Sequence, residues 1–152
     1  MSDKPTEKKR VLTVGVYDYF HYGHVRLFEQ ARAVTPEAHL IVAVQESDYI
    51  RKFKPEANIF YSTDIRTKLV AALRCVDEVV TYTEVNRIVR ELEFDIFAVG
   101  ADQNHAGFAE AIAYCESRGI RVARLQRTPN ISSTMIKETL AAQKEEPGSN
   151  KR

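Results

Sequence analysis

The chain has 152 residues, of which 44% are hydrophobic, and this length and composition fit one domain with one core. Its 22 basic and 21 acidic side chains nearly cancel, which argues against a protein that coats nucleic acid or an anionic membrane. No apolar stretch approaches the roughly 20 residues that span a bilayer, and the polar N-terminus does not resemble a secretion signal. Cys75 and Cys115 form no CxxC pair and are expected to be free thiols, so we expect a cytoplasmic protein.

Apolar runs typical of strands alternate along the chain with segments of helical periodicity. Strands are predicted at residues 11–16, 39–44, 78–82, 96–100 and 121–125. Helices are predicted at residues 24–33, 63–73, 84–92 and 107–118, with a last helix beginning near Ser132. The charged stretch 45–61, which contains Pro55, is expected to be a long loop, and the polar ends 1–10 and 144–152 are expected to be disordered.

This succession of β–α units predicts a Rossmann-like α/β domain over residues 11–143, with a five-stranded parallel sheet and helices on both faces. In such folds ligands bind beyond the carboxyl ends of the strands, near the switch in strand order. The residues that directly follow the strands are therefore the candidates for a functional site.

The first predicted strand leads directly into Gly15 and the segment GVYDYFHYGH. A helix that begins there offers unpaired N–H groups and a partial positive charge, which suit a phosphate. Gly23 has no Cβ, so a triphosphate could approach the backbone closely. His21 and His24 are three residues apart and can direct ring nitrogens at the same phosphate oxygens, where they would stabilise developing charge.

Two other interpretations of the histidine pair are open. The pair could ligate a metal, but a structural zinc site needs two further ligands, and no matching Cys or His pair follows. The two residues could also be ordinary surface histidines. Their position immediately after the first strand of an α/β domain favours a functional role.

Residues 15–31 (GVYDYFHYGHVRLFEQA) resemble the GTFDxxHxGHxxLLxxA signature of the nucleotidyltransferase superfamily, and within it the bacterial glycerol-3-phosphate cytidylyltransferases. The resemblance extends from about Val11 to Leu140. It implies an enzyme that couples a nucleotide to a small phosphorylated acceptor and releases pyrophosphate.

The resemblance assigns roles to the first motif. His21 and His24 match the HxGH histidines, which contact the nucleotide phosphates and stabilise the transition state, and Asp18 matches the aspartate of GTFD, near the acceptor. Val16 replaces the usual threonine, so the backbone N–H groups of Val16 and Tyr17 are expected to contact the phosphates instead.

Two basic motifs follow. In the loop segment RKFK, Lys52 and Lys54 are both candidates for the family lysine that binds phosphates of the nucleotide or acceptor. Arg66 and the later segment that begins at Arg74 (RCVDEV) resemble R-x7-R-Y-V-D-E-V and are expected to bind the acceptor. The two arginines are eight residues apart, about two helical turns, so we expect them to share a helix face. Family members often form homodimers with the site close to the subunit contact, so a homodimer is expected.

The last motif joins the segment VGAD after the fourth strand to residues 127–134 (RTPNISST), which resemble RTxGISTT. The guanidinium fork of Arg127 and the hydroxyls and amides at the start of the last helix suit phosphate. The nucleotide-binding residues expected here are Gly100, Asp102, Arg127, Ile131, Ser132, Ser133 and Thr134. Asn130 replaces a glycine of the family motif. The exchange is tolerable because asparagine, like glycine, accepts left-handed backbone angles. Gln103 replaces a tryptophan that helps form the base and ribose pocket.

The expected reaction is in-line attack of an acceptor phosphate oxygen on the α-phosphorus of CTP, with glycerol-3-phosphate or another polyol or sugar phosphate as acceptor. His21, His24, Lys54 and Arg127 are the expected catalytic residues. Mg²⁺ is expected to bind through the phosphates rather than through protein ligands, and no nucleic acid or membrane partner is expected. The alternatives are adenylyl transfer from ATP to a phosphorylated sugar or cofactor precursor, and a non-catalytic nucleotide sensor.

Overall fold

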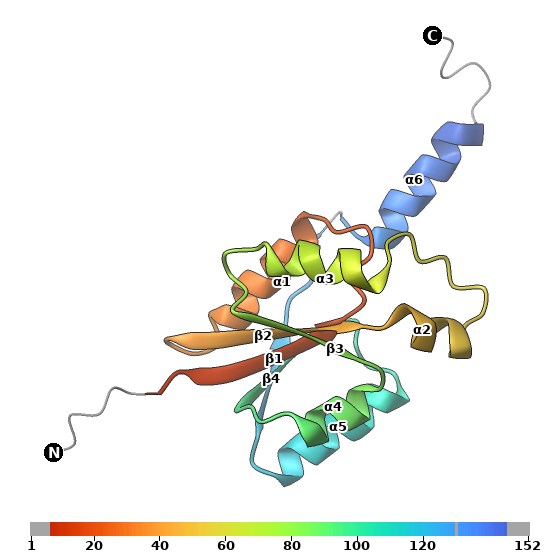
Figure 1. Ribbon diagram of the computed structural model, residues 1–152. Coiled ribbons are helices and arrows are strands. Elements are labelled where there is room, and N and C mark those ends of the chain that lie inside the picture. Colours follow the sequence, from red (N-terminus) through yellow and green to blue (C-terminus); the bar gives the residue numbers. More distant parts are fainter. Residues whose placement is uncertain (1–6, 130, 146–152) are drawn as a thin grey trace, which may run out of the picture.

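The computed structural model describes residues 7–129 and 131–145, which form one parallel sheet covered by helices on both faces (Figure 1). The strand order is β3-β2-β1-β4-β5, and every neighbouring pair is parallel. The strands are β1 (Lys9–Gly15), β2 (Ala38–Gln45), β3 (Glu78–Tyr82), β4 (Ile96–Gly100) and β5 (Arg121–Leu125). The predicted Rossmann-like fold is therefore confirmed.

Helices α1 and α3 lie over one face of the sheet and α4 and α5 over the other, while α6 projects away from the sheet (Figure 1). The helices are α1 (Tyr22–Arg32), α2 (Ser47–Phe53), α3 (Thr63–Ala71), α4 (Val85–Glu91), α5 (Ala106–Ser117) and α6 (Ser133–Glu145). Successive β1 residues pack into opposite cores: Val11 packs with Phe28 of α1, and Leu12 packs with Phe108 of α5. The inner strand β4 is apolar and buried along its whole length because both faces are covered, whereas the edge strands β3 and β5 carry exposed polar side chains.

The segment expected to be one long loop contains the short helix α2 at Ser47–Phe53. The rings of Tyr49 and Phe53, one helical turn apart, lie 4.8 Å apart between centroids, and the Tyr49 hydroxyl donates to Glu84 at 2.8 Å. The helix ends at Phe53, and Lys54, which precedes Pro55, has non-helical backbone angles, because the proline ring clashes with a helical conformation of the residue before it.

Other boundaries also differ from the expected ones. α3 ends at Ala71 rather than at residue 73, because a turn closed by Val76 N–H and Leu73 carbonyl leads the chain into β3. β1 begins at Lys9, which pairs with Ala38 of β2, so Lys9 and Arg10 belong to the sheet and not to a leader. Most of the expected leader and tail, and Asn130, lie outside the described residues.

The carboxyl ends of β1 and β4 separate at the switch in strand order. The two strands pair only through Val11 with Ile96 and Leu12 with Phe97. Beyond these pairs the side chain of Gln103 bridges the strands: its oxygen accepts from Gly100 N–H at 2.9 Å, and its nitrogen donates to the Val14 carbonyl at 2.7 Å. Gln103 thus connects the two strands at the point where a ligand is expected.

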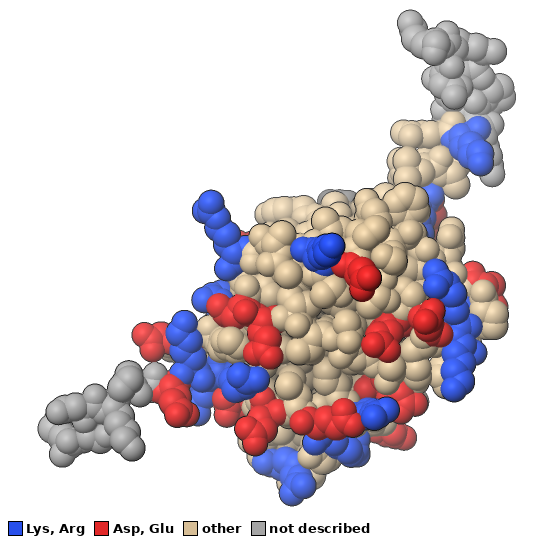
Figure 2. All heavy atoms as spheres, in the orientation of Figure 1, with Lys and Arg blue, Asp and Glu red and all other residues tan. Residues whose placement is uncertain are grey.

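The surface charge agrees with the near-zero net charge of the sequence. On the face seen in Figure 2, basic and acidic side chains are interspersed and do not gather into one basic surface. Within residues 7–129 and 131–145, no helix is both long enough and apolar enough to cross a membrane.

Candidate active site

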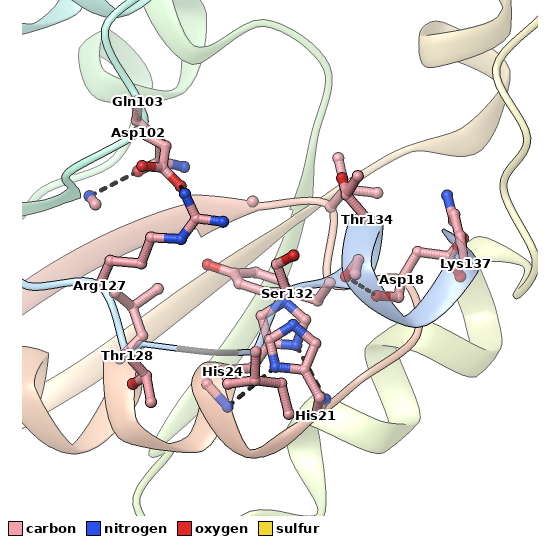
Figure 3. Close-up of a pocket in the computed structure, with 18 of the residues that line it drawn as sticks. Asp18, His21, His24, Asp102, Gln103, Arg127, Thr128, Ser132, Thr134 and Lys137 are labelled. Carbon is pink, nitrogen blue, oxygen red and sulfur yellow. Dashed lines mark hydrogen bonds and ion pairs between the residues drawn. The ribbon is translucent and has the colours of Figure 1, made fainter. Parts of the chain in front are cut away.

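A cavity of about 680 Å³ opens at the carboxyl ends of β1, β4 and β5 (Figure 3). Its walls come from the segments that follow β1, β2, β4 and β5 and from the start of α6. The predicted site residues that line it are Val16, Tyr17, Asp18, His21, Gly23, His24, Lys54, Gly100, Asp102, Arg127, Ile131, Ser132, Ser133 and Thr134. The cavity therefore brings together segments that are more than a hundred residues apart in sequence.

The two histidines of the HxGH segment cap α1 reciprocally. Nδ1 of His21 accepts from Gly23 N–H at 3.0 Å, and Nδ1 of His24 accepts from His21 N–H at 3.2 Å. Their rings stack with 3.9 Å between centroids. Because each Nδ1 is an acceptor, the neutral form of each ring carries its proton on Nε2, which becomes a hydrogen-bond donor with a fixed tautomer.

Both rings are neutral at pH 7. Burial, with a smaller contribution from His21, lowers the pKa of His24 to about 4, and burial also lowers the pKa of His21 below its ordinary value. A bound polyphosphate would oppose these shifts, because nearby negative charge favours the protonated ring. The pair is thus suited to donate hydrogen bonds to phosphate oxygens and to gain positive charge as negative charge develops.

His105 provides an internal comparison for the capping role. Its Nδ1 accepts from Gly107 N–H at 3.2 Å and caps α5 just as His21 caps α1. His105 does not line the cavity, and Phe108 follows it where His24 follows His21. Capping by a single histidine is therefore enough for α5, whereas α1 has a second histidine that completes a reciprocal capping box, and only the α1 pair lies in the cavity.

Gly23 lines the cavity and also has a role in packing. A Cβ at this position would lie 2.7 Å from the His21 ring and 3.4 Å from Ile131 Cγ2. The absence of a side chain allows the His21 ring to fold back onto its own helix. It also lets Ile131 pack against the start of α1, which joins the 127–134 segment to the histidines.

The start of α6 is tied to the first loop by its serines. The hydroxyl of Ser133 donates to the Asp18 carbonyl at 2.8 Å, and the Ser132 hydroxyl accepts from Met135 N–H at 3.0 Å as a helix cap. α6 therefore directs its N-terminal end, where helix amides carry partial positive charge, at the cavity.

Tyr17 supports the histidines from the core side. Its ring packs edge-on against His24, with 5.5 Å between centroids, and against Phe28 at 5.1 Å. Its backbone has a φ of 59°, a left-handed conformation that few non-glycine residues adopt. A Cβ on Gly15 would lie 2.7 Å from the Tyr17 ring, so the glycine makes room for it. The Tyr17 side chain is thus structural.

Arg127 and Asp102 form an ion pair on the rim of the cavity, with 3.4 Å between Nη1 and Oδ2 (Figure 3). Both side chains are more than half exposed, at 56% and 65%. Ion pairs this exposed contribute roughly 0–1 kcal/mol. A polyphosphate can therefore compete for the Arg127 guanidinium at little cost.

The basic residues separate into those at the cavity and those away from it. Of the two candidate lysines, Lys54 lines the cavity, whereas Lys52 does not and lies 5.7 Å from the centre of the Phe53 ring. Lys137 of α6 also lines the cavity and donates to the Asn58 carbonyl at 3.0 Å. We did not identify Lys137 from the sequence; its position one helical turn after Ser133 is the signal that could have revealed it.

Neither arginine of the R-x7-R motif lines the cavity. Arg66 is fully buried, and its guanidinium donates five hydrogen bonds to carbonyl and hydroxyl oxygens of the described residues. Arg74 is exposed and lies beyond the end of α3, so the expectation that both share a helix face is wrong. An acceptor bound in this cavity would therefore not contact Arg66 or Arg74 of the same chain, contrary to the expectation from the motif.

The carboxylate of Asp18 accepts the backbone N–H groups of Phe60 at 2.6 Å and Tyr61 at 3.0 Å. Although Asp18 lines the cavity, its two oxygens already hold the segment that precedes α3. Among the described residues, no group of three or more His, Cys, Asp or Glu side chains is placed to hold a metal ion.

Residues 12–139 match the cytidylyltransferase-like family. The glycerol-3-phosphate cytidylyltransferase of Bacillus subtilis is 29% identical over 136 residues, which cover 88% of this chain and 98% of that protein. The FAD synthase of Thermococcus sibiricus is 40% identical over 105 residues, which cover 65% of this chain and 68% of that protein. The bifunctional protein HldE of Shewanella amazonensis is 35% identical over 131 residues; these cover 83% of this chain but only 26% of HldE, about a quarter of its length.

Among solved structures, the lipopolysaccharide core biosynthesis protein from Thermoplasma volcanium GSS1 has a TM-score of 0.65 at 23% identity. The match covers 80% of this chain and 98% of that one, so the two proteins share a fold. Because the matched family model spans most of the chain, this protein belongs to the cytidylyltransferase-like family, in agreement with the resemblance of residues 15–31.

Proposed function

We propose that this protein transfers a nucleoside monophosphate from a nucleoside triphosphate to the phosphate of a small acceptor, with release of pyrophosphate. One observation carries the proposal: the HxGH histidines and the 127–134 segment line the same cavity. Two imidazoles, a guanidinium and the amino end of α6 thus face one space, which suits a triphosphate.

In the proposed reaction, an acceptor phosphate oxygen attacks the α-phosphorus. A new phosphorus–oxygen bond forms as the bond to the β-phosphate oxygen breaks, and pyrophosphate leaves on the opposite side. The attacking oxygen is already ionised, so no strong general base is needed. The Nε2–H groups of His21 and His24 donate to the phosphate oxygens on which charge gathers.

The remaining charges suit the two substrates. Arg127 leaves its exposed pair with Asp102 and binds the β- and γ-phosphates near the start of α6. Lys54 and Lys137, which line the cavity from two different segments, bind the acceptor phosphate. Catalysis then consists of positioning and charge stabilisation.

Magnesium fits this arrangement as an ion carried by the nucleotide. The Asp18 oxygens are occupied by backbone N–H groups, and the described residues hold no group of three or more His, Cys, Asp or Glu side chains that could bind the ion, so phosphate oxygens and water would supply most of its ligands. Bound there, Mg²⁺ would neutralise phosphate charge.

CTP is the donor we propose first, with glycerol-3-phosphate or another polyol or sugar phosphate as acceptor. The family and the relative from Bacillus subtilis, which is matched over 98% of its length, support this choice. ATP is the second candidate, because the relative from Thermococcus sibiricus is named an FAD synthase and FAD contains an adenylate. The expected homodimer and cytoplasmic location belong to the same proposal.

The test is a pyrophosphate-release screen that crosses four nucleoside triphosphates with glycerol-, polyol- and sugar-phosphates in the presence of Mg²⁺. We expect CTP with one acceptor class to give the highest kcat/KM. If ATP gives the highest value, the adenylyl alternative holds. A chain that binds nucleotide but releases no pyrophosphate with any pair would instead be a sensor, and the proposed reaction would be refuted.

A further inference from the structure

Arg66 is a charged residue in the protein interior, at the amino end of α3, and none of its side chain is exposed. A guanidinium has five N–H donors, and each is matched here by one acceptor of the chain. The acceptors are the carbonyls of Tyr61 at 3.0 Å, Val16 at 2.8 Å and Gln45 at 2.8 Å, and the hydroxyls of Ser47 at 2.5 Å and Thr63 at 3.4 Å. No donor is left for a substrate.

These five acceptors lie at the places where segments meet at the carboxyl edge of the sheet. Val16 follows β1 in the first loop, Gln45 ends β2, and Ser47 begins α2. Tyr61 and Thr63 lie where the next segment enters α3. One buried group therefore sets the position of the first loop relative to the chain between β2 and α3.

Asp18 holds the same segment from the other side. Its carboxylate accepts the N–H groups of Phe60 and Tyr61, while Arg66 takes the Tyr61 carbonyl. Tyr61 is thus fixed at both of its backbone polar groups. The segment held in this way, residues 54–62, contributes Lys54, Ala57, Asn58 and Ile59 to the cavity wall.

We propose that Arg66 is a positioning residue that holds segment 54–62, and with it Lys54, in register with the phosphate-facing first loop. The inference rests on the proposed function for its kinetic consequence, but not for its structural one. A direct role in binding the acceptor would need an accessible guanidinium with a free donor, and Arg66 has neither. A role in stability alone would leave the kinetic constants of the folded enzyme unchanged.

The test compares Arg66→Lys and Arg66→Met with Arg87→Lys, a control at an exposed arginine of α4 outside the cavity. All variants are measured well below their melting temperatures. Lysine keeps the charge but places its three donors on one nitrogen, which cannot reach five acceptors. We therefore expect both Arg66 variants to raise the KM for the acceptor about tenfold or more, by a larger factor than the KM for the nucleotide.

A second readout does not depend on activity. Hydrogen–deuterium exchange over residues 54–62 should speed up about tenfold in Arg66→Lys, because the Tyr61 carbonyl loses its donor and Asp18 alone then holds the N–H groups of Phe60 and Tyr61. Arg87→Lys should exchange like the unaltered chain. If the protein releases no pyrophosphate, the proposed function fails while the exchange experiment still decides the role of Arg66.

Two results would overturn the inference. One is an Arg66→Lys variant whose exchange over 54–62 and acceptor KM match those of Arg87→Lys. The other is near-normal activity in Arg66→Lys with loss in Arg66→Met, which would make charge alone the requirement. If neither Arg66 variant folds, Ser47→Ala decides: it removes one acceptor, and about threefold faster exchange over 54–62 supports the role, whereas unchanged exchange overturns it.

Discussion

His21 and His105 allow the catalytic role of a histidine to be measured apart from its structural role. Each ring accepts the N–H of the glycine two residues later, at 3.0 Å for His21 and 3.2 Å for His105, and each caps a helix. Only His21 lines the cavity. Replacing either residue by alanine removes the same kind of cap, so His105→Ala is a matched control for His21→Ala.

The two roles predict different changes in melting temperature and in kcat. Loss of one helix cap costs about 1 kcal/mol, which for a domain of this size lowers the melting temperature by roughly 2–4 °C. Both variants should show a shift in this range. Loss of a donor that stabilises charge in the transition state lowers kcat by about 100- to 1,000-fold. Only His21→Ala should show that loss, and His105→Ala should keep kcat within about twofold.

The assay is steady-state pyrophosphate release with the donor and acceptor found in the screen, combined with thermal unfolding of both variants. Measurements at a temperature where both remain folded separate capping from chemistry. Equal kcat in His21→Ala and His105→Ala would refute the catalytic role of His21 and reduce the residue to a cap. A loss of kcat in both variants would show that helix stability, not the imidazole, governs turnover.

Three further predictions concern the same cavity. The pKa of His24 falls from 6.5 to about 4 in the folded chain, so the unfolded chain takes up the proton first on acidification. The free energy of unfolding therefore falls by about 3 kcal/mol as the pH is lowered from 6.5 to 4, and this contribution of His24 is fully present above pH 6.5. In His24→Gln the melting temperature should depend less on pH within that window. A dependence equal to that of the unaltered chain would contradict the lowered pKa of His24. In Gly23→Ala the new Cβ would lie 2.7 Å from the His21 ring, so kcat should fall about tenfold or more, whereas Gly107→Ala, outside the cavity, should retain its kcat. Lys137→Ala should raise the acceptor KM about tenfold, as expected for loss of a charged hydrogen bond, and Lys52→Ala should leave it unchanged; equal effects of the two lysine variants would remove Lys137 from the acceptor site.

The fold and the core of the site could be predicted from sequence because their signals are local. The apolar runs of β1 and β2 indicate strands covered on both faces, and the HxGH segment directly follows the first of them. In a parallel sheet the carboxyl ends of the strands meet at one edge, so the 127–134 segment was expected near the histidines. The cavity contains both.

The tertiary structure alone decided the roles that depend on several segments at once. The five acceptors of Arg66 come from chain positions between Val16 and Thr63, so no sequence window around Arg66 indicates that its charge is buried and its donors are used. The choice between Lys52 and Lys54 depended on the path of the chain as α2 ends, and Arg74 left the expected helix face because α3 ends at a turn. Periodicity reports which faces are apolar, but hydrogen bonds between distant segments fix where each charge lies.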